Sequence, residues 1–118
     1  MKLLIADDSE LLRQSLKKLL HPVLEIDQVF EAADPAEAIH VIDQYYPDVL
    51  ILDLRFHEGN GFEVMDHLID HDLEMLVIVL TNFATQHNEH KCYDKGAHYF
   101  FDKSHDYERL EEVIRAFA

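Results

Sequence analysis

The sequence predicts an α/β domain in three layers, in which five helices cover both faces of a doubly wound five-stranded parallel sheet. Short apolar runs alternate along the chain with segments in which apolar residues recur at helical spacing. Two of the runs, residues 48–53 and 75–80, are apolar on both faces, as in the central strands of a covered sheet. With right-handed crossovers the strand order is 2-1-3-4-5, and the length suits one domain over residues 1–118.

The first strand and helix are followed by a weaker strand. Residues 2–6 form the first apolar run, and Ser9 can cap the helix that follows it. Pro22 separates this helix from a strand near residues 25–31, whose mixed polarity suits an edge of the sheet. The leucines expected on one buried face of the helix are Leu11, Leu12, Leu16, Leu19 and Leu20.

The second helix has the strongest start signal in the chain. Asp34 is an acidic N-cap, Pro35 occupies the first helical position, and Glu37 stands three residues after the cap. The helix is expected to end near Tyr46, because Pro47 disfavours helical geometry in the residue before it.

The second half of the chain repeats the alternation. Asn60 lies in a glycine-flanked turn and can cap a third helix after the strand at 48–53. A short polar helix is expected around residues 86–94, and a fifth strand over residues 97–101. The apolar residues expected to face inward are Phe62, Met65, Leu68 and Ile69 in the third helix, and Tyr107, Leu110, Val113, Ile114 and Phe117 in the last.

Four of the predicted strands end beside a residue that can bind a cation or contact a phosphate. Asp7 and Asp8 follow the first strand, Asp53 ends the third, Thr81 follows the fourth, and Lys103 lies shortly after the fifth. These strand ends meet at one edge of a parallel sheet, where ligands of such sheets bind. Three carboxylates and one ammonium group suit a hard divalent cation beside a phosphoryl group. The residues therefore predict a Mg²⁺-assisted phosphoryl site.

The net charge restricts the class of partner. Ten Lys and Arg against 24 Asp and Glu give a net charge of −14, which argues against direct binding to nucleic acid or to an anionic membrane. A partner is expected to present a basic or an apolar face. The longest apolar run has six residues, and no leader precedes Leu3, so neither a membrane span nor a signal peptide is expected. The single Cys92 fits a cytoplasmic protein.

The same residues resemble the receiver domain of bacterial two-component response regulators, and the resemblance spans the whole chain. The family is similar in fold to the small chemotaxis response regulator, which has a flavodoxin-like sheet. The elements that carry the resemblance are Asp7-Asp8, Asp53 with Gly61 eight residues on, Thr81 after the fourth strand, and Gly96-Ala97 ahead of Phe100 and Lys103.

The resemblance implies a phosphoacceptor site. Asp53 would accept a phosphoryl group from a histidine kinase or a histidine phosphotransfer protein. Asp8, Asp53 and the backbone carbonyl of Arg55 would bind Mg²⁺ directly, and Asp7 would act partly through water. The chain would phosphorylate and dephosphorylate only itself, so it is not expected to be an enzyme for an external substrate.

The resemblance also implies a switch. Lys103 would pair with one phosphoryl oxygen and Thr81 would hydrogen-bond another. Thr81 would move toward the phosphate, and the side chain of Phe100 would turn inward. The surface formed by the fourth helix, fifth strand and fifth helix would then change for a partner. That surface is a common dimer interface in the family, which leaves a homodimer open.

Some positions depart from the family pattern. Ser104 follows Lys103 where many receivers have proline after a cis bond, and a cis bond before serine costs roughly 2.5–4 kcal/mol, so a trans bond is expected unless strain holds it in cis. His57 stands where proline is frequent. Asn82 is larger than the usual Ala or Gly and could narrow access to Asp53. Phe100 lacks the hydroxyl of the commoner tyrosine.

Several alternatives stay open at this level. The chain could be a pseudo-receiver that binds partners without being phosphorylated. A Mg²⁺-dependent phosphohydrolase is disfavoured because Arg55 stands where such enzymes usually carry a second acid. His67 and His71 lie four residues apart and could chelate a transition metal, although a solvated helix face is the simpler interpretation. The kinase, the downstream target, and whether the domain stands alone or belongs to a longer protein are not predicted.

Overall fold

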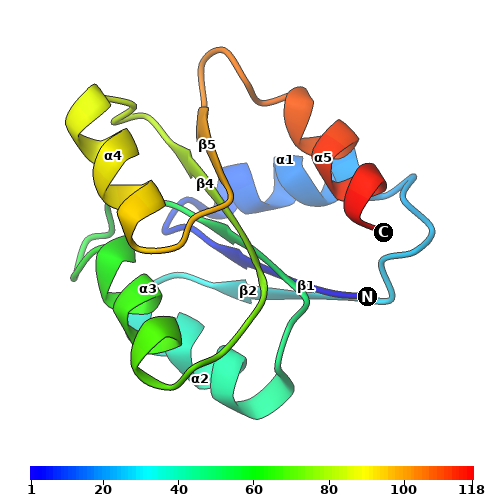
Figure 1. Cartoon of the computed structure of the whole chain (residues 1–118). Helices are drawn as coiled ribbons and strands as arrows, with labels where there is room; N and C mark the ends of the chain where they lie inside the picture. The colour runs from blue at the N-terminus through cyan, green and yellow to red at the C-terminus, as the bar shows by residue number, and fades with distance from the viewer.

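A computed structural model describes all of residues 1–118 and contains one parallel sheet of five strands in the order β2-β1-β3-β4-β5 (Figure 1). This order and the alternation with five helices confirm the predicted fold class. The elements are β1 (Lys2–Ala6), α1 (Glu10–Leu20), β2 (Gln28–Ala32), α2 (Pro35–Tyr45), β3 (Val49–Leu52), α3 (Gly61–Asp70), β4 (Leu76–Thr81), α4 (Gln86–Asp94), β5 (Tyr99–Asp102) and α5 (Arg109–Phe117).

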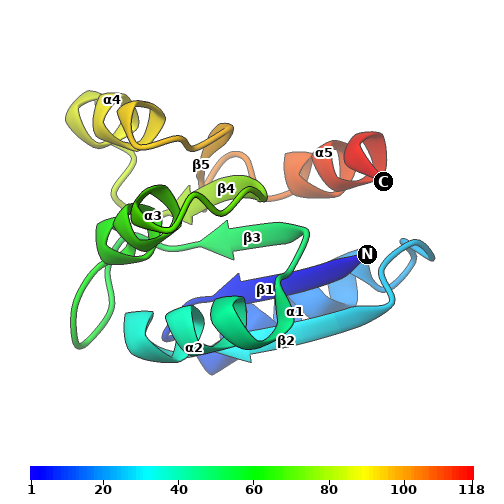
Figure 2. The same ribbon diagram turned by 60° about the horizontal axis from the view of Figure 1, so that its bottom comes forward.

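The sheet separates two apolar cores. Helices α1 and α5 cover one face, and α2, α3 and α4 cover the other (Figure 2). Alternate residues of β1 point to opposite cores: Leu3 and Ile5 lie in the α1/α5 core, and Leu4 and Ala6 lie in the other. All four residues of β3 are buried, which fits a strand at the centre of a sheet covered on both faces.

The predicted helix caps are present. The Ser9 side chain accepts a hydrogen bond from the Leu12 N–H, and the Asp34 side chain accepts one from the Glu37 N–H. Asn60 forms a capping box with Glu63 at the start of α3. These bonds join residues three positions apart, so the local sequence was sufficient to predict them.

Two details of the predicted elements are wrong. The second strand begins at Gln28 rather than at residue 25, because residues 21–27 form turns and Val23 is buried within them. Leu11 is 80 % exposed. At about 100° per residue, it lies roughly 140° around α1 from the buried Leu16, outside the face that meets the sheet.

Ile69 and Phe117 are also exposed, against expectation. Both lie in the last turns of their helices, where they line an open groove of about 800 Å³ at the amino edge of the sheet. None of the helices is long and apolar enough to span a membrane.

Candidate functional site

Three carboxylates meet at the carboxyl edge of the sheet. The N–H of Asp7 donates to the Ala32 carbonyl and that of Asp53 donates to the Ala6 carbonyl, so both residues continue the pairing of their strands by one position. Asp7 and Asp53 are buried and Asp8 is partly buried. One carboxylate oxygen from each of the three lies within 4.8 Å of the others. The structure therefore brings together the three acids that the sequence placed at one edge.

Lys103 joins two of these acids. Its Nζ lies 2.7 Å from Asp7 Oδ2 and 2.8 Å from Asp53 Oδ2, and its side chain is 12 % exposed. The backbone places it there, because the Lys103 N–H donates to the Thr81 carbonyl at the end of β4. The peptide bond to Ser104 is trans, as expected, since the chain contains no cis bond.

Burial and pairing act in opposite directions on the ionisable groups. Burial raises the pKa of Asp7, although hydrogen bonds from Lys103 and the Ser9 N–H oppose the rise. Burial alone would lower the pKa of Lys103, but its hydrogen bonds to Asp53 and Asp7 outweigh burial and raise it. The ammonium group is thus kept charged between the two acids.

The Asp53 side chain is oriented by its own loop. Oδ1 accepts a hydrogen bond of 2.7 Å from the Leu54 N–H, while Oδ2 faces Lys103. Gly61 closes this loop, because its N–H donates to the Leu54 carbonyl and α3 begins directly against the backbone of Asp53. A side chain at position 61 would meet that backbone.

Thr81 is fully buried at the end of β4, and its hydroxyl accepts a hydrogen bond of 3.1 Å from the Phe83 N–H. The Phe83 carbonyl accepts one of 2.9 Å from the Asn88 side chain of α4. The Arg55 guanidinium lies 3.9 Å from the centre of the Phe83 ring. The loops after β3 and β4 are therefore in contact.

The remaining predicted residues lie farther from the acids. Phe100 is partly buried and packs against the core beneath α2, α3 and α4. His57 is exposed, with Nε2 3.7 Å from Asp8 Oδ2. His67 bonds to Asp43 at 2.8 Å and its ring packs on His71, and neither histidine belongs to a cluster of three metal-ligating groups. The transition-metal interpretation has no support in the structure.

The part played by Arg13 was not predicted from the sequence. Its Nη1 donates a hydrogen bond of 2.6 Å to the Asp7 carbonyl, and its Nε bonds to Glu31 of β2. The only signal available was a basic residue in the first turn of a helix beside an acidic loop.

The donor set fits a hard cation. All three acids offer oxygen ligands, Asp7 and Asp53 are shielded from solvent, and one lysine cannot offset three carboxylates. Mg²⁺ binds such oxygen ligands and keeps several waters, for which the more open Asp8 side leaves space.

Comparison with known families decides the identity of the domain. The family model of the response regulator receiver domain matches residues 3–115. The chain belongs to this family. It is a receiver domain of two-component response regulators, with the strand order β2-β1-β3-β4-β5 described above.

Relatives of this receiver include transcriptional regulators. It is 34 % identical over 84 residues to the DNA-binding transcriptional activator DevR/DosR of Mycobacterium tuberculosis, covering 71 % of this chain and 39 % of that protein. It is 26 % identical over 117 residues to the transcriptional regulatory protein DegU of Brevibacillus brevis, covering 99 % and 50 %. The receiver thus spans half or less of the length of these relatives.

Solved structures agree with this fold. A LuxR-family DNA-binding response regulator from Staphylococcus aureus matches with a TM-score of 0.88 and 26 % identity, over 98 % of this chain and 96 % of that one. A LuxR-family two-component response regulator from Aurantimonas matches with a TM-score of 0.89 and 25 % identity, over 98 % and 83 %.

Proposed function

We propose that this receiver accepts a phosphoryl group on Asp53 from a histidine kinase or a histidine phosphotransfer protein, in a Mg²⁺-dependent reaction. The observation that carries the proposal is the set of three carboxylates at one sheet edge, two of them buried and both bonded to Lys103. Asp8, Asp53 and the Arg55 carbonyl would hold the ion, with Asp7 acting partly through water. Mg²⁺ would offset the repulsion between a carboxylate and an incoming phosphoryl group.

The transfer itself exchanges one bond for another. A carboxylate oxygen of Asp53 attacks the phosphorus of a phosphohistidine, a P–O bond forms, and the P–N bond breaks. The electron pair of the broken bond returns to the imidazole nitrogen of the donor. Lys103 then moves from Asp53 Oδ2 to a phosphoryl oxygen, which keeps the ammonium group paired with negative charge throughout.

Thr81 would couple phosphorylation to the rest of the domain. Its hydroxyl accepts from the Phe83 N–H and can at the same time donate its own proton to a phosphoryl oxygen. Movement of Thr81 toward the phosphate would pull on the loop before α4, because the same hydroxyl holds Phe83, whose carbonyl is bonded to Asn88 of α4. Phe100 on β5 would turn inward in the same transition.

The face of α4, β5 and α5 is the proposed output surface. Tyr93 and Tyr99 are exposed there, and the Tyr99 and Phe101 rings are 5.7 Å apart. Arg109 of α5 lies over the Phe101 ring at 5.0 Å. A partner protein or a second copy of the receiver would bind this face. Because the relatives are transcriptional regulators, we infer that this receiver controls an output segment or a partner protein in the cytoplasm. Any contact with DNA would be made by that output segment or partner, and not by the acidic receiver.

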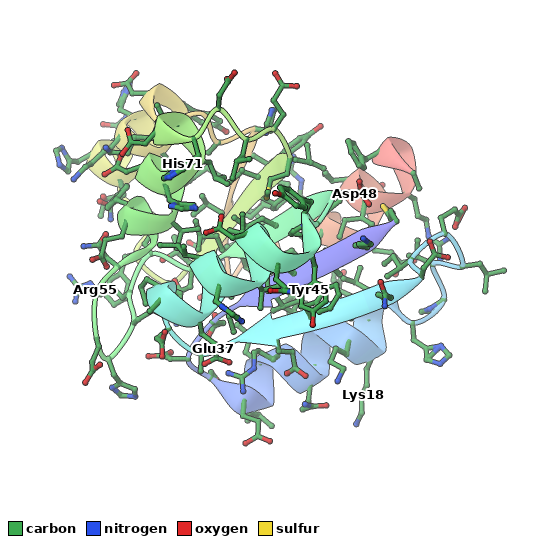
Figure 3. All side chains as sticks on the ribbon, turned by 90° about the horizontal axis from the view of Figure 1, so that it is seen from below. Lys18, Glu37, Tyr45, Asp48, Arg55 and His71 are labelled. Carbon is green, nitrogen blue, oxygen red and sulfur yellow. The ribbon has the colours of Figure 1, made fainter.

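Acetyl phosphate tests the proposal directly. Incubation with Mg²⁺ should add the mass of one phosphoryl group to the wild type and to Asp48→Asn, but none to Asp53→Asn or to protein treated with a chelator. Asp48 is the matched control, because it lies just before β3 and Asp53 just after it, at the two ends of the same strand. Figure 3 shows Asp48 well apart from Arg55, which follows Asp53 in the same loop. A folded wild type that gains no mass would establish the pseudo-receiver alternative.

A further inference from the structure

The peptide between the two acids that follow β1 is held by a side chain from α1. The carbonyl of this peptide belongs to Asp7 and accepts the 2.6 Å hydrogen bond from Arg13 Nη1. Arg13 lies in the first turn of α1, and helical side chains lean toward the N-terminus of their helix, so its guanidinium reaches back to the end of β1.

The guanidinium is held in turn from the edge strand. Arg13 Nε donates a hydrogen bond of 3.0 Å to Oε1 of Glu31 on β2, and Lys17 Nζ bonds to Oε2 of the same carboxylate at 3.1 Å. The Arg13 side chain is 13 % exposed. Burial opposes the charge on Glu31, but the bonds from Arg13 and Lys17 outweigh it and hold the pKa of Glu31 below its ordinary value.

Asp8 needs this restraint more than its neighbour does. The Asp7 carboxylate is fixed by the Ser9 N–H at 2.8 Å and by Lys103. The Asp8 carboxylate accepts no hydrogen bond, and the basic side chain that approaches it is that of the exposed His57, 3.7 Å away. The direction in which Asp8 points therefore depends on the plane of the preceding peptide, whose oxygen Arg13 holds.

We propose that Arg13, anchored by Glu31, is a positioning residue for the magnesium site, because it fixes the peptide that aims the Asp8 carboxylate at the ion. This inference rests on the proposed function. A planar guanidinium can bond the Asp7 carbonyl and the Glu31 carboxylate together, whereas a lysine ammonium of equal charge lacks that fork.

Magnesium titration of the full chain, followed through backbone amide resonances, tests the proposal without requiring phosphorylation. Arg13→Lys preserves the charge and should raise the Kd for Mg²⁺ about tenfold, because losing a residue that orients a metal ligand commonly weakens metal binding by this factor. Glu31→Ala, which touches neither acid, should have a similar effect. The double variant should be little worse than either single one, because both remove the same restraint.

Lys17→Gln is the matched control. It removes a cation from the same Glu31 carboxylate but has no bond to the acidic loop, so its Mg²⁺ Kd should equal that of the wild type. Urea unfolding gives the free energy of unfolding of each variant, which shows whether a change in Kd merely follows a loss of stability. The Kd should rise for Arg13→Lys and Glu31→Ala but not for Lys17→Gln, whatever stability each variant loses.

The outcomes are distinguishable. Unchanged Kd in Arg13→Lys and Glu31→Ala, or an equal loss in Lys17→Gln, would overturn the positioning role and leave the proposed function standing. A folded wild type without Mg²⁺ affinity would overturn the metal site and, with it, this inference.

Discussion

Replacing Gly61 by alanine should destabilise the receiver and damage its site together. Gly61 is the first residue of α3, and its φ is not in the left-handed region, so the backbone itself would accept alanine. A Cβ there would, however, overlap the Asp53 carbonyl oxygen and stand 3.2 Å from Leu54 Cα. These are backbone atoms of a loop held between β3 and α3, so they cannot move aside independently.

Two opposing effects set the magnitude. Alanine in place of glycine in a helix favours folding by roughly 0.5–1 kcal/mol. Overpacking against a fixed backbone costs typically 1–3 kcal/mol, so the expected net loss is about 1 kcal/mol and at most about 2.5 kcal/mol. With an unfolding entropy of about 2.1 cal/mol/K per residue, a chain of 118 residues should lose about 5 °C in Tm and at most about 10 °C.

Thermal unfolding followed by circular dichroism measures the stability of each protein. Labelling with acetyl phosphate, at a temperature where the wild type and the variant are both folded, measures the ability of Asp53 to be phosphorylated. Gly96→Ala is the comparison. Gly96 has φ 96° and open space around it, so alanine there should cost about 1–2 kcal/mol through backbone strain alone. Labelling should fall in Gly61→Ala and not in Gly96→Ala. A Tm of Gly61→Ala at or above that of the wild type would refute the overlap with Asp53.

Four further predictions concern access, charge and reactivity. Asn82→Ala should shorten the half-life of the phosphorylated protein, measured by loss of labelled phosphate, and an unchanged half-life would contradict a shielding role. Phe83→Ala removes the ring that stacks on Arg55 and should also speed hydrolysis, whereas Phe83→Tyr should not. Lys103→Gln leaves buried carboxylates without their cation and should cost roughly 3 kcal/mol in urea unfolding, with partial recovery in Mg²⁺; equal stability would show that the ion pairs contribute little. Burial raises the pKa of Cys92 to about 11 from an ordinary 9.0, so at pH 9 the thiol stays neutral and iodoacetamide should alkylate the folded protein far more slowly than the urea-unfolded protein.

The predictions that succeeded depend on local or periodic features. Asp34 and Asn60 cap their helices through bonds to residues three positions away, and such spacings are visible in the sequence. The acidic set was also predictable, because residues that follow parallel strands must emerge at the same edge of the sheet. The starting point of β2 was missed because the turns before it contain apolar residues that resemble a strand.

Sequence alone determined the class of sheet, the strand order and which acids share an edge. Strands that alternate with helices must run parallel, and parallel strands end at the same edge of the sheet. Only the tertiary structure decided that Arg55 stacks on Phe83 and that Arg13 bonds the Asp7 carbonyl. Each of these depends on how a loop or helix end approaches another element. Contacts of that kind follow from the packing of the whole domain, which no local spacing of residues encodes.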